Sequence, residues 1–268
     1  MPIGPAQMPL FDHLAELRRR LMVVVVTLFI ASCGLWLVSD TLVFIIVHPV
    51  IYIIRPELTG QINDVASMKA AGILNLGDVF TGFGLRFKVS IVFALFVTSP
   101  VWIWQILGFF LPALKPNERK WVVPTFFAAI TLFTAGAVFC YFFILPPAFD
   151  WLLGQVRDIA TVLPFADSYV NSILLFEIGF GLAFELPLVV FYLTVFNIIP
   201  YKKLRKSWRV VYIVLMVVSA VITPDASPIT MVLMFSALLV LYEGSLFVAR
   251  LVLARRISKT PEATEEEG

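Results

Sequence analysis

Long apolar runs alternate with short polar segments along this chain, and most of the runs are of membrane-spanning length. The first run, Leu21 to Val38, holds eighteen residues without a charge, which suffices for a helix to cross the hydrocarbon core of a bilayer. The later runs are about Phe87 to Phe110, Trp121 to about Leu145, about Val170 to Phe196, Val210 to Ile222, and Ile229 to Val248. The pattern therefore predicts an all-α membrane protein in which residues 21–250 form one domain of six transmembrane helices.

Proline positions within these runs predict bends and ends. Pro100 is expected to bend the second helix and Pro146-Pro147 to close the third, because proline cannot continue the hydrogen bonding of a helix. Pro187 is expected to kink the fourth helix. The fifth run has only thirteen apolar residues, and we predict that the fifth and sixth helices are short.

The connection between the first two runs is long and irregular, and we expect it to form an external cap of about residues 39–86. Within it Leu42 to Ile54 is apolar but too short to span the membrane, and His48-Pro49 interrupts it with an expected turn at Pro49. This segment is predicted to lie on the membrane surface or to re-enter the membrane. Asparagine, aspartate and glycine mark the rest of the connection as loops with short helices.

The N-terminal run is amphipathic. Four leucines recur at helical spacing and share one face of a helix, namely Leu10, Leu14, Leu17 and Leu21. Glu16 precedes Arg20 by one helical turn, which is the favoured order for an ion pair. Three consecutive arginines then end the run where the first apolar segment begins. Residues 1–20 are therefore predicted to form a short helix along the cytoplasmic membrane surface.

Composition and charge agree with a polytopic membrane protein and indicate its orientation. Apolar residues make up 60% of the chain and charged residues 14%, against ~25% charged residues in an ordinary soluble domain. Basic residues near the span ends number fifteen on the side of both termini and five on the other side. Such an excess is typical of cytoplasmic segments, so both termini are predicted to be cytoplasmic. The tail, residues 251–268, has no apolar pattern and is predicted to be disordered.

The N-terminal run also resembles a family signature. His13-Leu14-Ala15-Glu16-Leu17-Arg18-Arg19-Arg20-Leu21 is similar to the His-Leu-x-Glu-Leu-Arg-x-Arg-Leu segment that opens TatC proteins, the multispanning receptor subunits of the twin-arginine protein translocase. Further fragments similar to the family follow in the right order: Phe109–Leu114, Glu118–Lys120, Phe180–Pro187, Thr223–Asp225 and Leu241–Glu243. The resemblance extends from about His13 to Arg250. It implies six spanning helices, with structural turns at Pro112, Pro224 and Asp225.

Recognition is the chemistry that this resemblance implies at the cytoplasmic face. A twin-arginine signal presents two guanidinium groups, and carboxylates accept paired hydrogen bonds from such groups. The resemblance places Glu16 and Glu118 at the signal-binding site, together with Arg18 and Phe109. The alternative for Glu16 is a plain helical pair with Arg20, and the alternative for Glu118 is a solvated position at the start of a helix.

Two carboxyl groups of the fourth run are expected inside the membrane. A charged side chain there costs ~2.5–3.5 kcal/mol on insertion scales, so both groups should face protein or a wet cavity, which they could share. The resemblance suggests that Glu185, next to Pro187, contacts a partner's transmembrane helix or an inserting signal. The alternative is a structural carboxyl bonded to a serine or threonine. Glu177 is not part of the family pattern, and its role is open.

Enzyme chemistry finds no support in the sequence. The two histidines, His13 and His48, are not near a cysteine or a carboxylate cluster at ligand spacing, so neither a metal nor another cofactor is expected. Cys33 and Cys140 lie in apolar runs, as packing residues do. The sequence has no phosphate-binding Gly-Lys-Ser/Thr loop, which argues against nucleotide hydrolysis. The resemblance implies transport that is driven by the protonmotive force.

The resemblance also implies partners and a location. The partners are twin-arginine signal peptides of folded cargo, single-span TatA- and TatB-type subunits, further copies of this chain and membrane lipid, but no nucleic acid. The location is the bacterial cytoplasmic membrane. The alternative from another class is a proton- or cation-coupled secondary transporter for small solutes, with Glu177 and Glu185 as a relay. Such transporters usually have two corresponding halves, and the spans of the two halves here differ in length.

Overall fold

Helices form nearly all of the chain that the structure describes. The computed structural model describes residues 10–54, 56–58, 60–72, 74–110, 119–156, 165–195, 199–223 and 227–257. These residues form no strand, and a single β-bridge among them joins Asn75 to Phe165. Five of their helical segments are long and apolar enough to cross a membrane: His13–Trp36, Val79–Val97, Val122–Gly154, Ala166–Thr194 and Pro228–Leu251. The predicted all-α membrane fold is confirmed.

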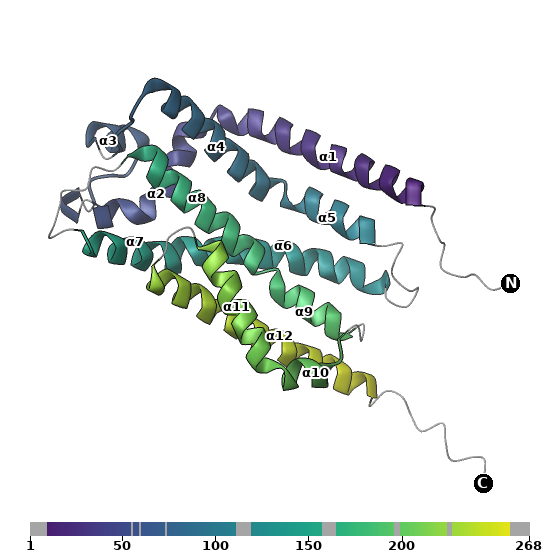
Figure 1. Ribbon diagram of the computed structural model, residues 1–268. Helices are drawn as coiled ribbons and strands as arrows, with labels where there is room; N and C mark the ends of the chain where they lie inside the picture. The colour runs from purple at the N-terminus through teal and green to yellow at the C-terminus, as the bar shows by residue number, and fades with distance from the viewer. Residues whose placement is uncertain are drawn as a thin grey trace, which may run out of the picture.

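The helices run between two ends of one bundle (Figure 1). α1 (Leu10–Trp36) begins and α12 (Pro228–Ile257) ends at the same end of the bundle. α2 (Ser39–Ile54), α3 (Val65–Ala70) and α7 (Leu145–Gly154) gather at the opposite end. This placement agrees with an even number of membrane crossings. The count of six and the cytoplasmic side of the termini stay predictions.

The first helix is longer than predicted. α1 continues without a break from Leu10 to Trp36, so the amphipathic run that was expected as a separate surface helix is the first part of the same helix. The physical reason is that residues 10–36 contain no proline and only one glycine, so the start of the apolar run does not interrupt helical hydrogen bonding. α1 lies at the edge of the bundle, against α4 (Val79–Val97) and α5 (Ser99–Phe110) (Figure 1).

The second span is bent near Pro100, as predicted, but it begins earlier than predicted. The Asp78 carboxylate caps α4 by accepting a hydrogen bond from the Thr81 N–H at 2.7 Å. At the other end of α4 the Thr98 hydroxyl donates to the Ala94 carbonyl at 2.7 Å, and α5 starts at Ser99. Pro100 therefore lies in the first turn of α5, where its missing N–H is tolerated.

The third span does not end at Pro146-Pro147, and that prediction was wrong. α6 (Val122–Phe139) passes into one π-helical segment, η4 (Cys140–Ile144), and then into α7. The two prolines occupy the first turn of α7, where a helix needs no donor from them. The wider π turn joins the two helices because the Leu145 N–H donates to the Cys140 carbonyl, five residues earlier.

The predicted turn at Pro49 was also wrong, whereas the placement of this segment on or in the membrane stays a prediction. α2 continues through Pro49, and Val47, Val50 and Ile51 have no exposed surface. Proline removes the hydrogen bond to the carbonyl four residues earlier, which belongs to Ile45. The hydroxyl of Tyr141, from η4, donates to that carbonyl at 2.6 Å. A tertiary contact therefore replaces the missing helical hydrogen bond.

The expected cap has the predicted short helices. η1 (Pro56–Leu58) and α3 follow α2, and Asp64 forms a capping box with Ser67 at the start of α3. Two ion pairs attach α4 to its neighbours. Arg86 pairs with Asp40 of α2 at 2.5 Å, and Lys88 pairs with Asp167 of α8 (Ala166–Ala183) at 2.9 Å.

The fourth span is broken between α8 and α9 (Leu186–Val195), so the predicted kink is confirmed. Phe184 and Glu185 form the break. Pro187 has no N–H for the Ala183 carbonyl, so α8 cannot continue past this point. α9 starts anew because the Glu185 carbonyl accepts hydrogen bonds from the N–H groups of Leu188 and Val189 at 3.0 and 3.2 Å.

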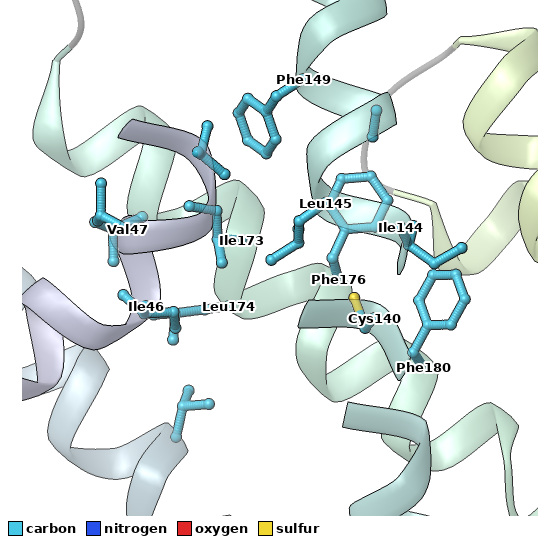
Figure 2. Close-up of a cluster of buried hydrophobic side chains, with 14 of the residues drawn as sticks. Ile46, Val47, Cys140, Ile144, Leu145, Phe149, Ile173, Leu174, Phe176 and Phe180 are labelled. Atoms are coloured by element: carbon cyan, nitrogen blue, oxygen red, sulfur yellow. The ribbon is translucent and has the colours of Figure 1, made fainter. Parts of the chain in front are cut away.

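The buried core lies where α2, η4, α7 and α8 meet. Figure 2 shows its side chains: Ile46, Val47, Cys140, Ile144, Leu145, Phe149, Ile173, Leu174, Phe176 and Phe180. α8 also approaches α6 closely, because a Cβ at Gly136 would lie only 2.6 Å from the Phe180 carbonyl oxygen. Small residues at such positions allow the close helix packing that holds membrane bundles together.

The last helices differ from each other in length. α11 (Trp208–Ile222) has 15 residues, or about 22 Å, which is shorter than a ~30 Å hydrocarbon core, so the short fifth helix is confirmed. α12 has 30 residues, so the prediction of a short sixth helix was wrong. The apolar run indicates only the part of α12 that lies in the membrane. The helix continues beyond it because arginine and leucine are good helix formers. Glu243 of α12 accepts from Arg205 of α10 (Tyr201–Lys206) at 2.7 Å and from Tyr212 of α11 at 2.8 Å.

Candidate functional site

α1 and α5 meet in a polar seam, which we define by His13, Glu16 and Arg20 of α1 and Gln105 and Phe109 of α5. The ring of His13 stacks on the ring of Phe109, with 4.4 Å between centroids and 22° between planes. Two turns further along α1, Nη1 of Arg20 donates to Oε1 of Gln105 at 3.3 Å. The seam therefore joins the first turns of α1 to the last turns of α5, near the end of the bundle where the chain begins.

Glu16 is half satisfied within this seam. Nε and Nη2 of Arg20 both donate to Oε1 of Glu16, at 2.9 and 2.5 Å. The other oxygen, Oε2, is buried and has no hydrogen-bond partner in the part of the chain that the structure describes. The helical pair that the spacing predicted is thus present, yet it uses only one of the two carboxylate oxygens. A buried acceptor without a donor is uncommon in folded proteins and indicates a place for a ligand donor.

Arg20 is held over the backbone of α5 at Gly108. A Cβ at this position would collide with the guanidinium group of Arg20, so a side chain there would displace the group that holds Glu16. Gly108 and Gln105 were not anticipated from the sequence. Their signal was available, because residues 105, 108 and 109 share one face of a helix, and a polar residue and a glycine stand out on that face.

The structure places the other predicted site residues as follows. Phe109 shares the seam with Glu16, whereas Arg18 is two residues beyond Glu16 and therefore ~200° around α1. Arg18 is exposed there, away from the seam. Four further predicted residues lie outside the described residues, namely Pro112, Glu118, Pro224 and Asp225.

Glu185 occupies the break in the fourth span. Its carbonyl starts α9, and its side chain is partly buried. Oε1 of Glu185 is buried and receives no hydrogen bond from any residue within the described ranges, so the alternative of a bond from serine or threonine is not found for this oxygen. Pro187 is buried in the first turn of α9, two residues after Glu185. The break thus contains one buried, unpaired acceptor within an apolar span.

Glu177 lies deeper in the protein, eight residues before Glu185 on α8. It is only 6% exposed, and its Oε1 likewise has no partner among the residues with a described position. Phe176, the residue before it, and Leu174, about one helical turn earlier, belong to the core in Figure 2. Burial of an unpaired polar oxygen in an apolar interior is unfavourable, so Glu177 is expected to destabilise the core. That Glu177 and Glu185 share a cavity stays a prediction.

These features define a class of protein. Over the described ranges no group of three histidines, cysteines, aspartates or glutamates could hold a metal ion. What the fold provides is a half-satisfied carboxylate at a helix seam and two unpaired carboxyl groups inside the bundle. The protein is a polytopic helical membrane protein with unpaired carboxylate oxygens at a helix seam and inside the bundle.

Comparison with known proteins identifies the family. The model of the family described as Sec-independent protein translocase protein (TatC) matches residues 12–236. The chain belongs to the TatC family. It is 34% identical to the Sec-independent protein translocase protein TatC of Deinococcus radiodurans, over 91% of this chain and 87% of that protein. It is 33% identical to the protein of the same name from Carboxydothermus hydrogenoformans, over 94% and 96% of the two chains.

The fold is also similar to a solved structure. A crystal structure described as the twin arginine translocase receptor TatC superposes with a TM-score of 0.72 at 31% sequence identity. The similarity covers 89% of this chain and 98% of that chain. These comparisons favour a translocase component over the small-solute transporter that was the alternative from the sequence.

Proposed function

We propose that this chain is the multispanning receptor subunit of a twin-arginine protein translocase. In this proposal it binds twin-arginine signal peptides at its cytoplasmic face and nucleates the complex that exports folded proteins, driven by the protonmotive force. It lies in the bacterial cytoplasmic membrane with six spans and both termini cytoplasmic. Membership of the TatC family and the likeness to the receptor structure support this assignment.

The observation that carries the proposal is the unpaired Oε2 of Glu16 in the α1–α5 seam. Arg20 holds Oε1 and so fixes the carboxylate in one orientation. A guanidinium group of the signal peptide then donates to Oε2, and Glu118 receives the second guanidinium, as the family resemblance implies. Phe109, which stacks on His13 in the seam, offers an apolar ring to the apolar segment that follows the two arginines of the signal.

The position of the seam decides how strongly it binds. Exposed ion pairs contribute only ~0–1 kcal/mol each, which would not hold a peptide. The Glu16 side chain is only 22% exposed, so a guanidinium bound to it is partly removed from water. Charge-assisted hydrogen bonds of this kind contribute ~1.5–3 kcal/mol each. Two carboxylates together therefore give a useful affinity for paired arginines.

In this proposal, partner subunits contact the part of the protein that lies inside the membrane. Glu185, with its unpaired oxygen at the α8–α9 break, accepts a hydrogen bond from a partner's transmembrane helix or from an inserted signal. α11 is shorter than the bilayer and exposes apolar side chains such as Val214, Val217 and Val221, so this edge suits a single-span TatA- or TatB-type subunit. Co-purification of such subunits, and of a second copy of this chain, from native membranes tests this part.

Peptide binding to the full-length purified protein tests the recognition site. A fluorescent twin-arginine signal peptide is titrated in detergent, and a peptide with two lysines in place of the arginines is the competitor. We expect the twin-arginine peptide to bind at least tenfold more tightly, because lysine cannot make the paired hydrogen bonds of a guanidinium. Glu16→Lys should abolish binding, and Glu16→Gln should weaken it about tenfold to a hundredfold.

The matched control is Glu243→Gln, which removes a carboxylate that holds Arg205 and Tyr212 but lies outside the seam. It should leave peptide affinity within about twofold of the unmodified protein. Equal affinity for the twin-lysine peptide would overturn the proposed recognition, and so would unchanged binding by Glu16→Lys. Helical circular dichroism of each variant establishes that the protein is still folded.

A further inference from the structure

The three consecutive arginines of α1 are divided into one paired and two unpaired groups. Arg20 holds Glu16 and Gln105 in the seam. Arg18 and Arg19 are exposed, and neither makes an ion pair or a side-chain hydrogen bond with another residue in the described part of the chain. Two guanidinium groups are therefore exposed just before the first apolar run, with Arg18 ~200° and Arg19 ~300° around α1 from Glu16.

A groove continues from these two arginines along the outer face of α1. It has a volume of about 620 Å³, and the side chains that line it are Ala15, Arg18, Arg19, Met22, Val23, Val26 and Thr27. Met22, Val23 and Val26 are 54%, 39% and 46% exposed, so no other described helix covers this face. The groove therefore combines a doubly cationic end with an apolar floor.

The length of the groove along α1 fits within one lipid leaflet. From Arg19 to Val26 is seven residues, or ~10 Å along a helix, which fits within the ~15 Å of one leaflet's hydrocarbon. The arginines thus lie at the level of phosphate groups when the valines lie at the level of acyl chains. α1 is at the edge of the bundle (Figure 1), so its outer face would meet lipid in a bilayer.

We propose that this groove is a binding site for one anionic phospholipid. The phosphate accepts hydrogen bonds from Arg18 and Arg19, and an acyl chain lies over Met22, Val23 and Val26. Charge complementarity selects the lipid, because a zwitterionic headgroup carries its own cation beside the phosphate and gains less from two free guanidinium groups. The lipid site is separate from the α1–α5 seam, since Glu16 and Arg20 take no part in it and Arg18, which the resemblance assigns to signal binding, lies away from the seam.

Native mass spectrometry of the full-length protein in detergent tests this site. The protein is titrated with phosphatidylglycerol and, separately, with phosphatidylcholine of the same acyl chains. We expect tighter binding of phosphatidylglycerol. The double variant Arg18→Gln/Arg19→Gln should weaken phosphatidylglycerol binding about 25-fold, at about fivefold for each arginine, and should weaken phosphatidylcholine binding by a much smaller factor.

Two control variants separate a built site from a general attraction to positive charge. Lys203→Gln/Lys206→Gln removes two exposed cations of α10 and should leave phosphatidylglycerol binding within about twofold of the unmodified protein. Val23→Trp/Val26→Trp fills the groove and should weaken phosphatidylglycerol binding with both arginines present. Val217→Trp/Val240→Trp, at exposed positions of α11 and α12, should leave it unchanged.

Three results would overturn the proposal. They are equal binding of the two lipids by the unmodified protein, unchanged phosphatidylglycerol binding by the double arginine variant, and an equal loss in the lysine variant. If the tryptophan variant does not fold, the two charge variants decide the question alone. Binding of the twin-arginine peptide by the double arginine variant, measured in parallel, distinguishes loss of the lipid site from loss of the recognition seam.

Discussion

α1 and α8 are both long apolar helices, yet their charged side chains lie in different surroundings. α1 lies at the edge of the bundle, and only 6% of its most apolar stretch is buried, against 50% for the stretch that contains α8 and α9. The charged residues of α1 lie near its first turns, where one ion pair is formed and two arginines stay free. α8 instead carries Glu177 within the core.

This difference indicates where polar side chains are free to bind a ligand and where they must be satisfied within the fold. On α1 a polar side chain meets the headgroup zone, so its interactions with a ligand or lipid are decided by solvent access. On α8 each polar atom must be satisfied by the fold or remain unpaired, because the surroundings offer no water. We expect substitutions in α8 and its contacts to affect stability, and substitutions in α1 to affect binding.

The largest difference is expected for two glycines. Gly136→Ala places a Cβ against the Phe180 carbonyl of α8 and should destabilise the protein by about 2–3 kcal/mol, as overpacking does. Gly34→Ala in α1 has no atom within 4 Å of the new Cβ and should be neutral or slightly stabilising. Thermal unfolding in detergent compares the two variants. Equal melting temperatures would show that α8 is not packed more tightly than α1.

The next effect distinguishes the carboxyl group at the α8–α9 break from the one in the α1–α5 seam. Glu185→Ala removes the unpaired acceptor at the α8–α9 break and should reduce export of a folded twin-arginine substrate at least tenfold. Its affinity for the signal peptide should change less than twofold, because the α1–α5 seam is on a different helix pair. Export assays in vesicles and peptide titration measure the two quantities. A Glu185→Ala protein that exports normally would contradict the role given to this group.

A smaller effect concerns the contact between Tyr141 and α2. Tyr141→Phe leaves the Ile45 carbonyl without the donor that replaces the missing Pro49 N–H, and should cost about 1–2 kcal/mol of unfolding free energy. In a Pro49→Ala background the helix supplies its own donor, so the same change should cost clearly less. A double-mutant cycle by thermal unfolding measures the coupling. Additive effects of the two substitutions would rule out the exchange of donors.

Glutamate-to-glutamine changes compare the two helices directly. Glu177→Gln removes a buried carboxyl that has an unpaired oxygen, so stability should be unchanged or higher by up to ~1 kcal/mol. Glu16→Gln weakens the pair with Arg20 and should lower stability by about 0.5 kcal/mol while it impairs peptide binding. Melting temperatures and peptide affinities of both variants are compared. A large loss of stability in Glu177→Gln would mean that the carboxyl is satisfied after all.

The smallest effect is at the start of α4, the helix that packs on α1. The hydrogen bond from the Thr81 N–H lowers the pKa of Asp78 below its ordinary value of 3.8. The capping contribution is therefore fully present above about pH 4 and is lost as the pH falls through the folded-state pKa. Asn also caps a helix but does not titrate. The melting temperature of the Asp78→Asn variant, relative to that of the unmodified protein, should therefore increase as the pH is lowered from 5 to 3. A constant difference over this range would contradict the assignment.

Much of the fold was predictable because the bilayer imposes one strong requirement. A helix that crosses it needs about twenty apolar residues, so α1, α6 and α8 could be located from the sequence. The bends near Pro100 and Pro187 were predictable for the same local reason, since proline lacks a donor. Glu16 and Phe109 were assigned to one site by resemblance alone, and their approach in the seam depends on how α1 packs against α5.

The sequence by itself determined where apolar and charged segments lie, which residues resemble the TatC family, and where proline breaks helical hydrogen bonding. Only the tertiary structure decided that Pro49 stays within α2, that the third span passes through a π turn before Pro146, and that one oxygen of Glu16 is left unpaired. The physical reason is the same in each case. A helix depends on neighbours three or four residues away, whereas the donor from Tyr141 to Ile45 and the contact of Arg20 with Gln105 join residues 96 and 85 positions apart.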